Sequence, residues 1–306
     1  MKTALLLGLS AILCSCAAQD PHTSRSVSGE IGHIPSWFKA TPPERIIGPV
    51  SYVGTEGIGA YLIASSKGHI LIDGGMPSSA KKIECSIRQL GEDPTKIRYL
   101  LVSHAHIDHV GTIAHFKKLT GAKVVVLDKE QELLESGGRK DYLWYLAKIP
   151  FLRYDPVKAD IVVKDGDARN FSDHRFTAIH TPGHTRGSTT WTTEIPHKGK
   201  RYKLVFGGAT TLLPGTHLVK NPSYPGIFPD FLKTFAILEG FKDTMYLSNH
   251  AHFIDFRNKR EIARTMGPDA YIDPKGFSET LAADKQKVLD KVAKGKAADL
   301  IRRGPR

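Results

Sequence analysis

The chain has few cysteines, and after its first residues it has no long apolar stretch. Only three cysteines occur in 306 residues, and two of them, Cys14 and Cys16, lie near the start. Cys85 is alone in the rest of the chain, which excludes an intrachain disulfide there. It falls within a pattern of helical spacing, and we predict a buried thiol without a chemical role. Because no later segment reaches about 20 apolar residues, we expect no membrane-spanning helix beyond residue 18.

The chain also lacks a dense basic run, although its formal charge is +12. Such a charge indicates nucleic-acid binding when the basic residues cluster on one face or within a motif. Here the lysines and arginines are scattered, and no aromatic-basic motif of an RNA-binding module is present. We therefore expect no nucleic-acid partner. A positive field would instead favour anionic small substrates.

The first eighteen residues have the pattern of a secretory leader. Lys2 is their only charged residue, and the apolar run Ala4–Leu13 is too short to span a bilayer. Residues 13–16, Leu-Cys-Ser-Cys, resemble a bacterial lipoprotein processing box, which would make Cys16 a lipidated N-terminus. Cleavage by an ordinary signal peptidase after Ala18 is an equal alternative. Both outcomes predict an exported, periplasmic protein, anchored to the membrane by lipid in the first case.

The rest of the chain divides into a polar arm and one domain. Residues 19–35 contain two prolines, three serines and two glycines and predict a flexible N-terminal arm. No linker interrupts residues 36–306, and we expect them to form a single domain and a monomer. Residues 139–157 are irregular and rich in aromatic residues, which favours core packing over the alternative of a flap that faces the substrate.

Strand and helix patterns alternate through this domain. Strands are predicted at 50–55, 60–64, 69–73, 99–102, 122–127, 160–163, 175–180, 188–193, 202–206 and 245–250, and helices at 78–90, 111–119, 130–136, 229–239, 257–266 and 278–301. Two halves of this kind predict an α/β protein in which two sheets pack face to face, with helices outside.

One short motif carries four side chains that bind metals. His104, His106, Asp108 and His109 follow the apolar run 99–102 and precede a predicted helix. In extended chain, His104 and His106 point to the same side, because side chains alternate with a period of two. Where the chain then turns into the helix, Asp108 and His109 can face a second point close by. Imidazole nitrogen and carboxylate oxygen are ligands that zinc accepts, so the motif predicts two neighbouring metal positions.

Further candidate ligands lie at the ends of other predicted strands. His184 stands on a tight Pro-Gly turn after the strand at 175–180 and is the third candidate for the first metal. His250 ends the strand that begins at 245 and is the third candidate for the second metal; His252 is a weaker alternative. His180 is still within its strand, where packing or hydrogen bonding is favoured. Asp73 is more consistent with orienting a ligand histidine, or simply with bonding backbone amides, than with binding the metal itself.

These motifs, in this order, resemble the metallo-β-lactamase superfamily and, within it, the third subclass of the class B β-lactamases. The resemblance extends from about Ser36 to the C-terminal helix. It is carried by Leu-Ile-Asp-Gly-Gly-Met-Pro at 71–77, Ser-His-Ala-His-Ile-Asp-His at 103–109, Gly-His-Thr-Arg-Gly-Ser-Thr at 183–189, Thr-Thr-Trp-Thr at 189–192, Asn-Pro-Ser-Tyr-Pro at 221–225 and Ser-Asn-His at 248–250.

The resemblance implies a four-layer αβ/βα sandwich that holds two zinc ions at one edge. It implies that His104, His106 and His184 bind the first zinc ion and that Asp108, His109 and His250 bind the second. The implied activity is hydrolysis of penicillins, cephalosporins and carbapenems, in which a zinc-bound hydroxide opens the β-lactam amide. Asp108 would orient the hydroxide and pass a proton to the leaving nitrogen, which makes it the expected catalytic residue.

The resemblance is incomplete in the segment after the strand at 202–206. Many relatives have an acid or a cysteine ligand near 207–210, and this chain has none there, as in the third subclass. Thr210 stands where that subclass has a serine, and we expect it to contact the substrate. Leu212 replaces another serine that helps to bind the substrate carboxylate. Other hydrolases of the superfamily, such as lactonases, thioester hydrolases and phosphodiesterases, remain the alternative function.

Overall fold

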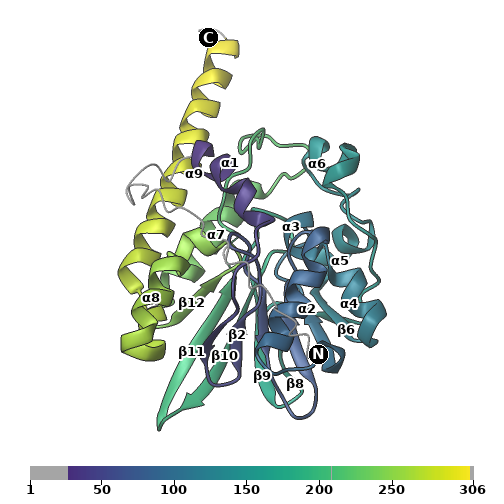
Figure 1. Ribbon diagram of the computed structural model, residues 1–306. Coiled ribbons are helices and arrows are strands. Elements are labelled where there is room, and N and C mark those ends of the chain that lie inside the picture. The colour runs from purple at the N-terminus through teal and green to yellow at the C-terminus, as the bar shows by residue number, and fades with distance from the viewer. Residues whose placement is uncertain (1–26, 208, 304–306) are drawn as a thin grey trace, which may run out of the picture.

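Two β-sheets packed face to face form the centre of the protein (Figure 1). The computed structural model describes residues 27–207 and 209–303. The first sheet has the order β1-β2-β3-β4-β5-β6-β7, with antiparallel pairing from β1 to β4 and parallel pairing from β4 to β7. Its strands are β1 (Glu44–Ile47), β2 (Val50–Tyr52), β3 (Tyr61–Ile63), β4 (His69–Ile72), β5 (Ile97–Leu101), β6 (Lys123–Leu127) and β7 (Ile161–Val163).

The second sheet has the order β12-β11-β10-β9-β8. Only its β11–β12 pair is parallel. Its strands are β8 (Ala168–Phe171), β9 (His174–His180), β10 (Thr189–His197), β11 (Lys200–Gly207) and β12 (Met245–Ser248). Strand β8 was not predicted from the sequence, because its segment Ala-Arg-Asn-Phe is polar and lies at the edge of the sheet, where burial imposes no apolar pattern.

Helices cover the outer faces of both sheets (Figure 1). Helices α2 (Ala80–Gln89), α4 (Ile113–Thr120) and α5 (Asp128–Glu135) lie on the first sheet, and α7 (Ile227–Glu239), α8 (Phe256–Met266) and α9 (Pro274–Arg303) lie on the side of the second. Shorter elements are α1 (Val27–Trp37), α3 (Ile107–Val110), α6 (Trp144–Lys148), η1 (Pro77–Ser79), η2 (Pro94–Lys96), η3 (Pro150–Leu152), η4 (Ala251–Ile254) and η5 (Gly267–Tyr271). The order helix, sheet, sheet, helix confirms the predicted four-layer αβ/βα sandwich.

The side chains of strand β6 contribute to two hydrophobic cores, one on each face of the first sheet. Val125 and Leu127 face the second sheet, whereas Val124 and Val126 face the outer helices, because neighbouring side chains point to opposite faces. Helices cover one face of this strand and the second sheet covers the other. Side chains on both faces are therefore apolar, which explains the run of valines. Each of these fully buried side chains contributes roughly 1.5–3 kcal/mol relative to exposure. The same alternation determines to which face of the sheet the side chain at the end of each strand points.

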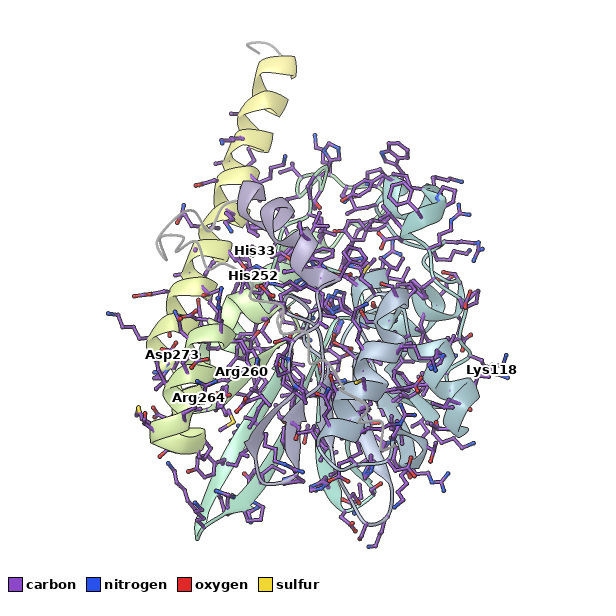
Figure 2. The ribbon with its side chains drawn as sticks, in the orientation of Figure 1. His33, Lys118, His252, Arg260, Arg264 and Asp273 are labelled. Carbon is purple, nitrogen blue, oxygen red and sulfur yellow. The ribbon has the colours of Figure 1, made fainter. Side chains whose placement is uncertain are left out.

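The segment predicted as a flexible arm is helical in part. Helix α1 begins at Val27, although Pro35 lies inside it. The C-terminal half of α1 contacts η4 and the residue before it. The rings of His33 and His252 stack at 4.3 Å between centroids (Figure 2), and the ring of Trp37 lies 5.6 Å from that of His250. A tertiary contact therefore orders residues whose composition favours coil. The predicted leader, including Cys16, lies outside the described residues.

Two further expectations differ from the structure, one about Cys85 and one about the aromatic segment 139–157. Cys85 is exposed on α2 rather than buried, because the apolar stripe of the helix is formed by Ile83 and Ile87. In the aromatic segment 139–157, Tyr154 is buried as expected, but Trp144 is 73% exposed and Phe151 is exposed as well. Among the described residues, no helix is both long and apolar enough to cross a bilayer.

Candidate metal centre

The predicted ligands meet because several strands end at the same edge of the two sheets. Strands β4 and β5 are parallel neighbours, so Asp73 and the segment His104–His109 emerge side by side after them. In the second sheet, His250 follows β12, and His184 stands on the turn between β9 and β10. Residues far apart in sequence are thus brought together by strand direction alone.

The six predicted ligands form two groups. The first cluster consists of His104, His106 and His184, and the second cluster consists of Asp108, His109 and His250. Within each cluster the three potential ligand atoms lie within 4.8 Å of one another. The clusters are adjacent, since the rings of His104 and His109 are only 4.2 Å apart. All six residues that the sequence pointed to are therefore in one place, in the predicted division into threes.

In the first cluster, His106 and His184 each have one ring nitrogen committed to a hydrogen-bond acceptor. Nε2 of His106 lies 2.9 Å from an oxygen of Asp141, and Nδ1 of His184 lies 2.8 Å from the carbonyl oxygen of Thr211. Nδ1 of His104 lies 3.2 Å from Oγ of Ser103, whose own hydrogen is donated to Asp73. Nδ1 of His104 also meets Nδ2 of Asn249 at 3.3 Å. Because a neutral imidazole has one N–H, the remaining nitrogen of His106 and of His184 carries a lone pair.

Those remaining nitrogens converge. Nδ1 of His106 and Nε2 of His184 are 3.1 Å apart, and Nε2 of His104 is buried without a hydrogen-bond partner among the described residues. Lone pairs at that distance repel each other, so a cation, either a proton or a metal ion, is required between them. Three imidazole nitrogens with fixed partners on their far side are a favourable donor set for a transition metal.

In the second cluster, two ring nitrogens also lie close together, but fewer hydrogen bonds hold the rings in place. Nε2 of His109 lies 3.2 Å from Nε2 of His250, and an oxygen of Asp108 is 3.1 Å from the former and 3.5 Å from the latter. Nδ1 of each of these two rings is buried without a hydrogen-bond partner in the described part of the chain. A carboxylate joined to two imidazoles completes a second set of three donors that fits a metal ion.

Burial keeps most of the cluster histidines neutral. It lowers the pKa of His184 to about 3 and those of His104 and His250 well below the usual value, with the neighbouring rings adding to the effect. For His106, burial opposes the charged form, but the Asp141 hydrogen bond and carboxylate outweigh it and raise the pKa. Burial would also raise the pKa of Asp108; the facing His109 and His250 overcome this and lower it, so the carboxylate is ionised.

Asp73 has the supporting position that the sequence suggested. It sits in the left-handed region with a φ of 56° directly after β4, and its two oxygens accept from the backbone N–H and the hydroxyl of Ser103 at 2.8 and 2.6 Å. Its distance to Nδ1 of His109 is 3.9 Å, too long for a hydrogen bond. Burial raises the pKa of Asp73 to about 6, against the effect of His109 and Ser103. Asp73 therefore supports His104 through Ser103 and does not join either cluster.

Two acidic residues near the clusters were missed by the sequence reasoning. Asp141, in the irregular aromatic segment, bonds the ring of His106. Glu130, in the first turn of α5, accepts from the backbone N–H of Ala105 at 2.6 Å and from two groups of the His184 loop. Burial raises the pKa of Glu130 to about 7, opposed by these donors. Neither acid has a sequence signal, since both are separated by more than twenty residues from the ligands they support.

Other predicted residues take part in the fold around the clusters. The Thr210 hydroxyl donates to Asp284 of α9 at 2.8 Å, so it is already engaged within the protein, and its predicted contact with a substrate stays a prediction. His180 hydrogen-bonds the carbonyl oxygen of Arg186, as expected for a strand histidine. His252 belongs to neither cluster and stacks on His33.

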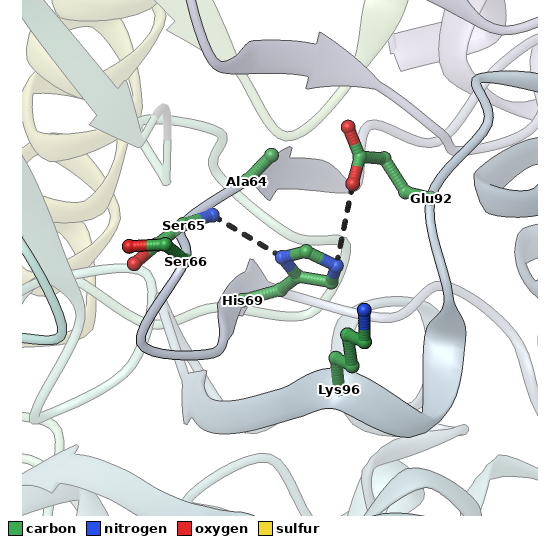
Figure 3. A pocket seen from close by; sticks show the side chains of 6 residues that line it. All are labelled: Ala64, Ser65, Ser66, His69, Glu92 and Lys96. Carbon is green, nitrogen blue, oxygen red and sulfur yellow. Dashed lines mark hydrogen bonds and ion pairs between the residues drawn. The ribbon is translucent and has the colours of Figure 1, made fainter.

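A separate pocket lies at the opposite end of β4 (Figure 3). It has a volume of about 380 Å³ and is lined by Ser65, Ser66, His69, Glu92 and Lys96, together with Ala64. Nδ1 of His69 accepts from the backbone N–H of Ser65, and Nε2 lies 3.5 Å from Glu92. One histidine and one acid do not make up a three-ligand set, so this pocket does not compete with the two clusters as a metal site.

Comparison with solved structures places the chain among known enzymes of this architecture. The FEZ-1 metallo-β-lactamase from Legionella gormanii is 32% identical, with a TM-score of 0.80, and the match covers 84% of this chain and 98% of that one. BJP-1, a subclass B3 metallo-β-lactamase of Bradyrhizobium japonicum, is 32% identical with a TM-score of 0.79, over 88% of this chain and 100% of that one.

Two curated relatives have lower sequence identity to this chain and are named as a lactonase and a thioesterase. An N-acyl homoserine lactonase, AttM, of Azorhizobium caulinodans is 28% identical over 45% of this chain, which spans 60% of the lactonase's own length. A human acyl-coenzyme A thioesterase, MBLAC2, is 29% identical over 40% of the chain and 44% of its own length. The model of the metallo-β-lactamase superfamily matches residues 54–197. The chain belongs to the metallo-β-lactamase superfamily of metal-using hydrolases, and its structural neighbours include a subclass B3 enzyme.

Proposed function

We propose that the protein is a β-lactam hydrolase that binds two zinc ions, one in each cluster. The observation that carries this proposal is the pair of adjacent three-donor sets, in which imidazole nitrogens of two different rings face one another at 3.1 Å in the first cluster and 3.2 Å in the second. Histidine and aspartate are zinc ligands, and neutral imidazoles in a buried site need no deprotonation before they bind. Bound there, zinc ions would act as Lewis acids and lower the pKa of water from 15.7 to about 7.

The residues of the chain then have defined tasks. Hydrolysis adds a water molecule across the amide: its oxygen joins the carbonyl carbon, the carbon–nitrogen bond breaks, and the nitrogen gains a proton. The carboxylate of Asp108 is ionised and lies within the second cluster beside His109 and His250, so it can accept a proton from water and return it to the leaving nitrogen. No serine or cysteine nucleophile is needed, and no acyl-enzyme should accumulate.

The choice of a β-lactam as substrate rests on two observations. Structures named as β-lactamases match more than four fifths of this chain at 32% identity, whereas the lactonase and thioesterase relatives match less than half. In addition, residues 207–210 contain neither an acid nor a cysteine, as expected for the third subclass. Penicillins, cephalosporins and carbapenems share the strained cyclic amide, and we propose all three as substrates.

Lactone or thioester hydrolysis is the second candidate, because the curated relatives have those names. The same two clusters could serve either reaction, since a fold does not determine a substrate. The difference must come from the groups that hold the substrate rather than from the metal ligands.

One experiment separates these candidates. Purified protein is supplied with zinc and offered nitrocefin, a penicillin and a carbapenem, and in parallel an acyl homoserine lactone and an acyl thioester. We expect the highest kcat/KM for the β-lactams; a preference of more than about tenfold for the lactone or thioester would refute the proposal. Chelation should abolish turnover while the circular dichroism spectrum is retained, because none of the six cluster residues belongs to the hydrophobic cores. Unfolding on chelation would point instead to a purely structural metal.

We also propose that the protein is exported to the periplasm, from the leader pattern of residues 1–18. Mass spectrometry of the mature N-terminus distinguishes the two processing outcomes. A diacylated Cys16 would identify a lipid-anchored protein, and a start at Gln19 would identify cleavage after Ala18. An intact Met1 on protein from the producing cell would contradict export.

A further inference from the structure

The peptide between His104 and His106 cannot satisfy its polar groups through regular structure. Ala105 lies after β5 has ended at Leu101 and before α3 begins at Ile107. The residue is fully buried, so unpaired backbone groups would be costly there. Its N–H donates to one oxygen of Glu130 at 2.6 Å, and its carbonyl accepts from the hydroxyl of Tyr154 at 2.8 Å. Two side chains therefore hold the peptide that carries the first two ligands.

The second oxygen of Glu130 holds the loop of the third ligand. It accepts from the hydroxyl of Thr185 at 2.9 Å and from the backbone N–H of Gly187 at 2.8 Å. Thr185 directly follows His184 in the chain. One carboxylate thus accepts three hydrogen bonds, one from the His104–His106 segment of the first sheet and two from the His184 loop of the second.

The packing around Glu130 leaves it little freedom. Its backbone belongs to the first turn of α5, and a Cβ added at Gly187 would lie 2.2 Å from the backbone nitrogen of Glu130. The loop therefore rests directly on the start of the helix, and only glycine permits that approach. Three donors and no acceptor face the carboxylate, so an ionised carboxylate fits the position and an amide, which must turn an NH₂ group toward a donor, does not.

We propose that Glu130 is a positioning residue that sets the separation of His104 and His106 from His184 and thereby the zinc affinity of the first cluster. Among the described residues its carboxylate hydrogen-bonds Ala105, Thr185 and Gly187 and none of the six ligand side chains. None of the residues that Glu130 hydrogen-bonds in the described part of the chain belongs to the second cluster. The effect is therefore selective for one cluster. This inference rests on the proposed zinc binding.

The test measures zinc affinity in two backgrounds that each retain one intact cluster. His250→Ala leaves only the first cluster complete, and His184→Ala leaves only the second. Glu130→Gln is added to each, and zinc affinity is measured by competition with a chromophoric chelator. We expect about 10- to 100-fold weaker binding in the His250→Ala background, the range for loss of an outer-shell partner, and less than about threefold change in the other. Glu84→Gln, at an equally buried acid of α2, is the matched control and should change neither affinity.

The outcomes separate this inference from the proposed function. Equal loss in both backgrounds, or no loss in either, would overturn the role of Glu130. Failure of the unsubstituted protein to bind zinc would instead overturn the proposed function, and zinc binding without β-lactam turnover would leave the role of Glu130 intact. If Glu130→Gln does not fold, zinc affinity is measured for substitutions of Thr185 in the same two backgrounds. Thr185→Val should weaken the first cluster while Thr185→Ser retains its affinity, and equal affinities in these two variants would overturn the inference.

Discussion

His106 and Asp141 form a hydrogen-bonded pair in which Nε2 of the imidazole lies 2.9 Å from Oδ2 of a buried carboxylate. The pair fixes the ring so that Nδ1 faces His184. Asp141 comes from the irregular segment that also contains the exposed rings of Trp144 and Phe151. The segment, whose regular elements are only the short α6 and η3, thus bonds a ligand ring of the first cluster directly, and the histidine depends on Asp141 for its orientation.

Asp141→Asn should weaken zinc binding to the first cluster by about 10- to 100-fold. Both oxygens of Asp141 accept hydrogen bonds, one from His106 and the other from the backbone N–H of Leu143 at 2.7 Å. An asparagine must direct its NH₂ group at one of these donors. Zinc competition in the His250→Ala background measures the loss. Asp173→Asn, at an exposed acid bonded to Ser65, is the control, and an equal loss there would show that the effect is not local.

His106→Ala and Asp108→Ala should each reduce β-lactam turnover by more than about 100-fold, beyond the range for outer-shell changes, because each removes a donor from its cluster. Steady-state kinetics with nitrocefin measure this. Lys118→Ala is the control, since Lys118 is an exposed residue on the outer helix α4 (Figure 2). Turnover near the wild-type rate in either cluster variant would contradict the proposed assignment.

Trp191→Phe should lower the free energy of unfolding by about 1–3 kcal/mol. The indole is 1% exposed between the sheets, and its N–H donates to the carbonyl oxygen of Val102 at 3.0 Å, so the change leaves that buried oxygen without its donor. Urea unfolding gives the difference. Trp144→Phe, at an exposed indole, should change stability by less than about 0.5 kcal/mol. A similar cost for both variants would mean that the Val102 contact is not the cause.

Glu84 should make the protein more stable at neutral than at acidic pH. Burial would raise its pKa, but hydrogen bonds from Lys81, His115 and Arg88 lower it to about 2. Because the folded pKa lies below the unfolded value of about 4.5, the contribution is complete above pH 4.5 and is lost as pH falls toward 2. Since Lys81 and Arg88 are largely exposed, we expect only about 1–2 kcal/mol.

Urea unfolding of wild type and Glu84→Gln at several pH values checks this expectation. The difference in stability should be largest at pH 7 and should narrow below pH 4.5. Glu132→Gln is the control, because Glu132 is exposed and pairs only loosely with Lys140 at 3.4 Å. A difference between wild type and Glu84→Gln that is constant from pH 7 to pH 3 would show that charge is not involved.

The zinc-ligand candidates and most of the strands were predictable, and the reason is local. His104, His106, Asp108 and His109 lie within six residues, and their spacing alone divides them between two points. Cys85 shows the limit of such reasoning: helical spacing identified the helix, but the cysteine falls beside the apolar stripe and is exposed. Helix α1 shows another limit, because it packs through Trp37 against His250, a residue more than 200 positions away.

The sequence by itself determined the alternation of strands and helices, the order of the motifs and the residue types able to hold a metal ion, because periodicity and donor chemistry are properties of short segments. Only the tertiary structure decided that Glu130, Asp141 and Asp73 support those residues and that Thr210 turns its hydroxyl to Asp284. Such contacts depend on where strands end in space and which loops then face one another. No local pattern encodes this, since the partners are joined only by the packing of two sheets.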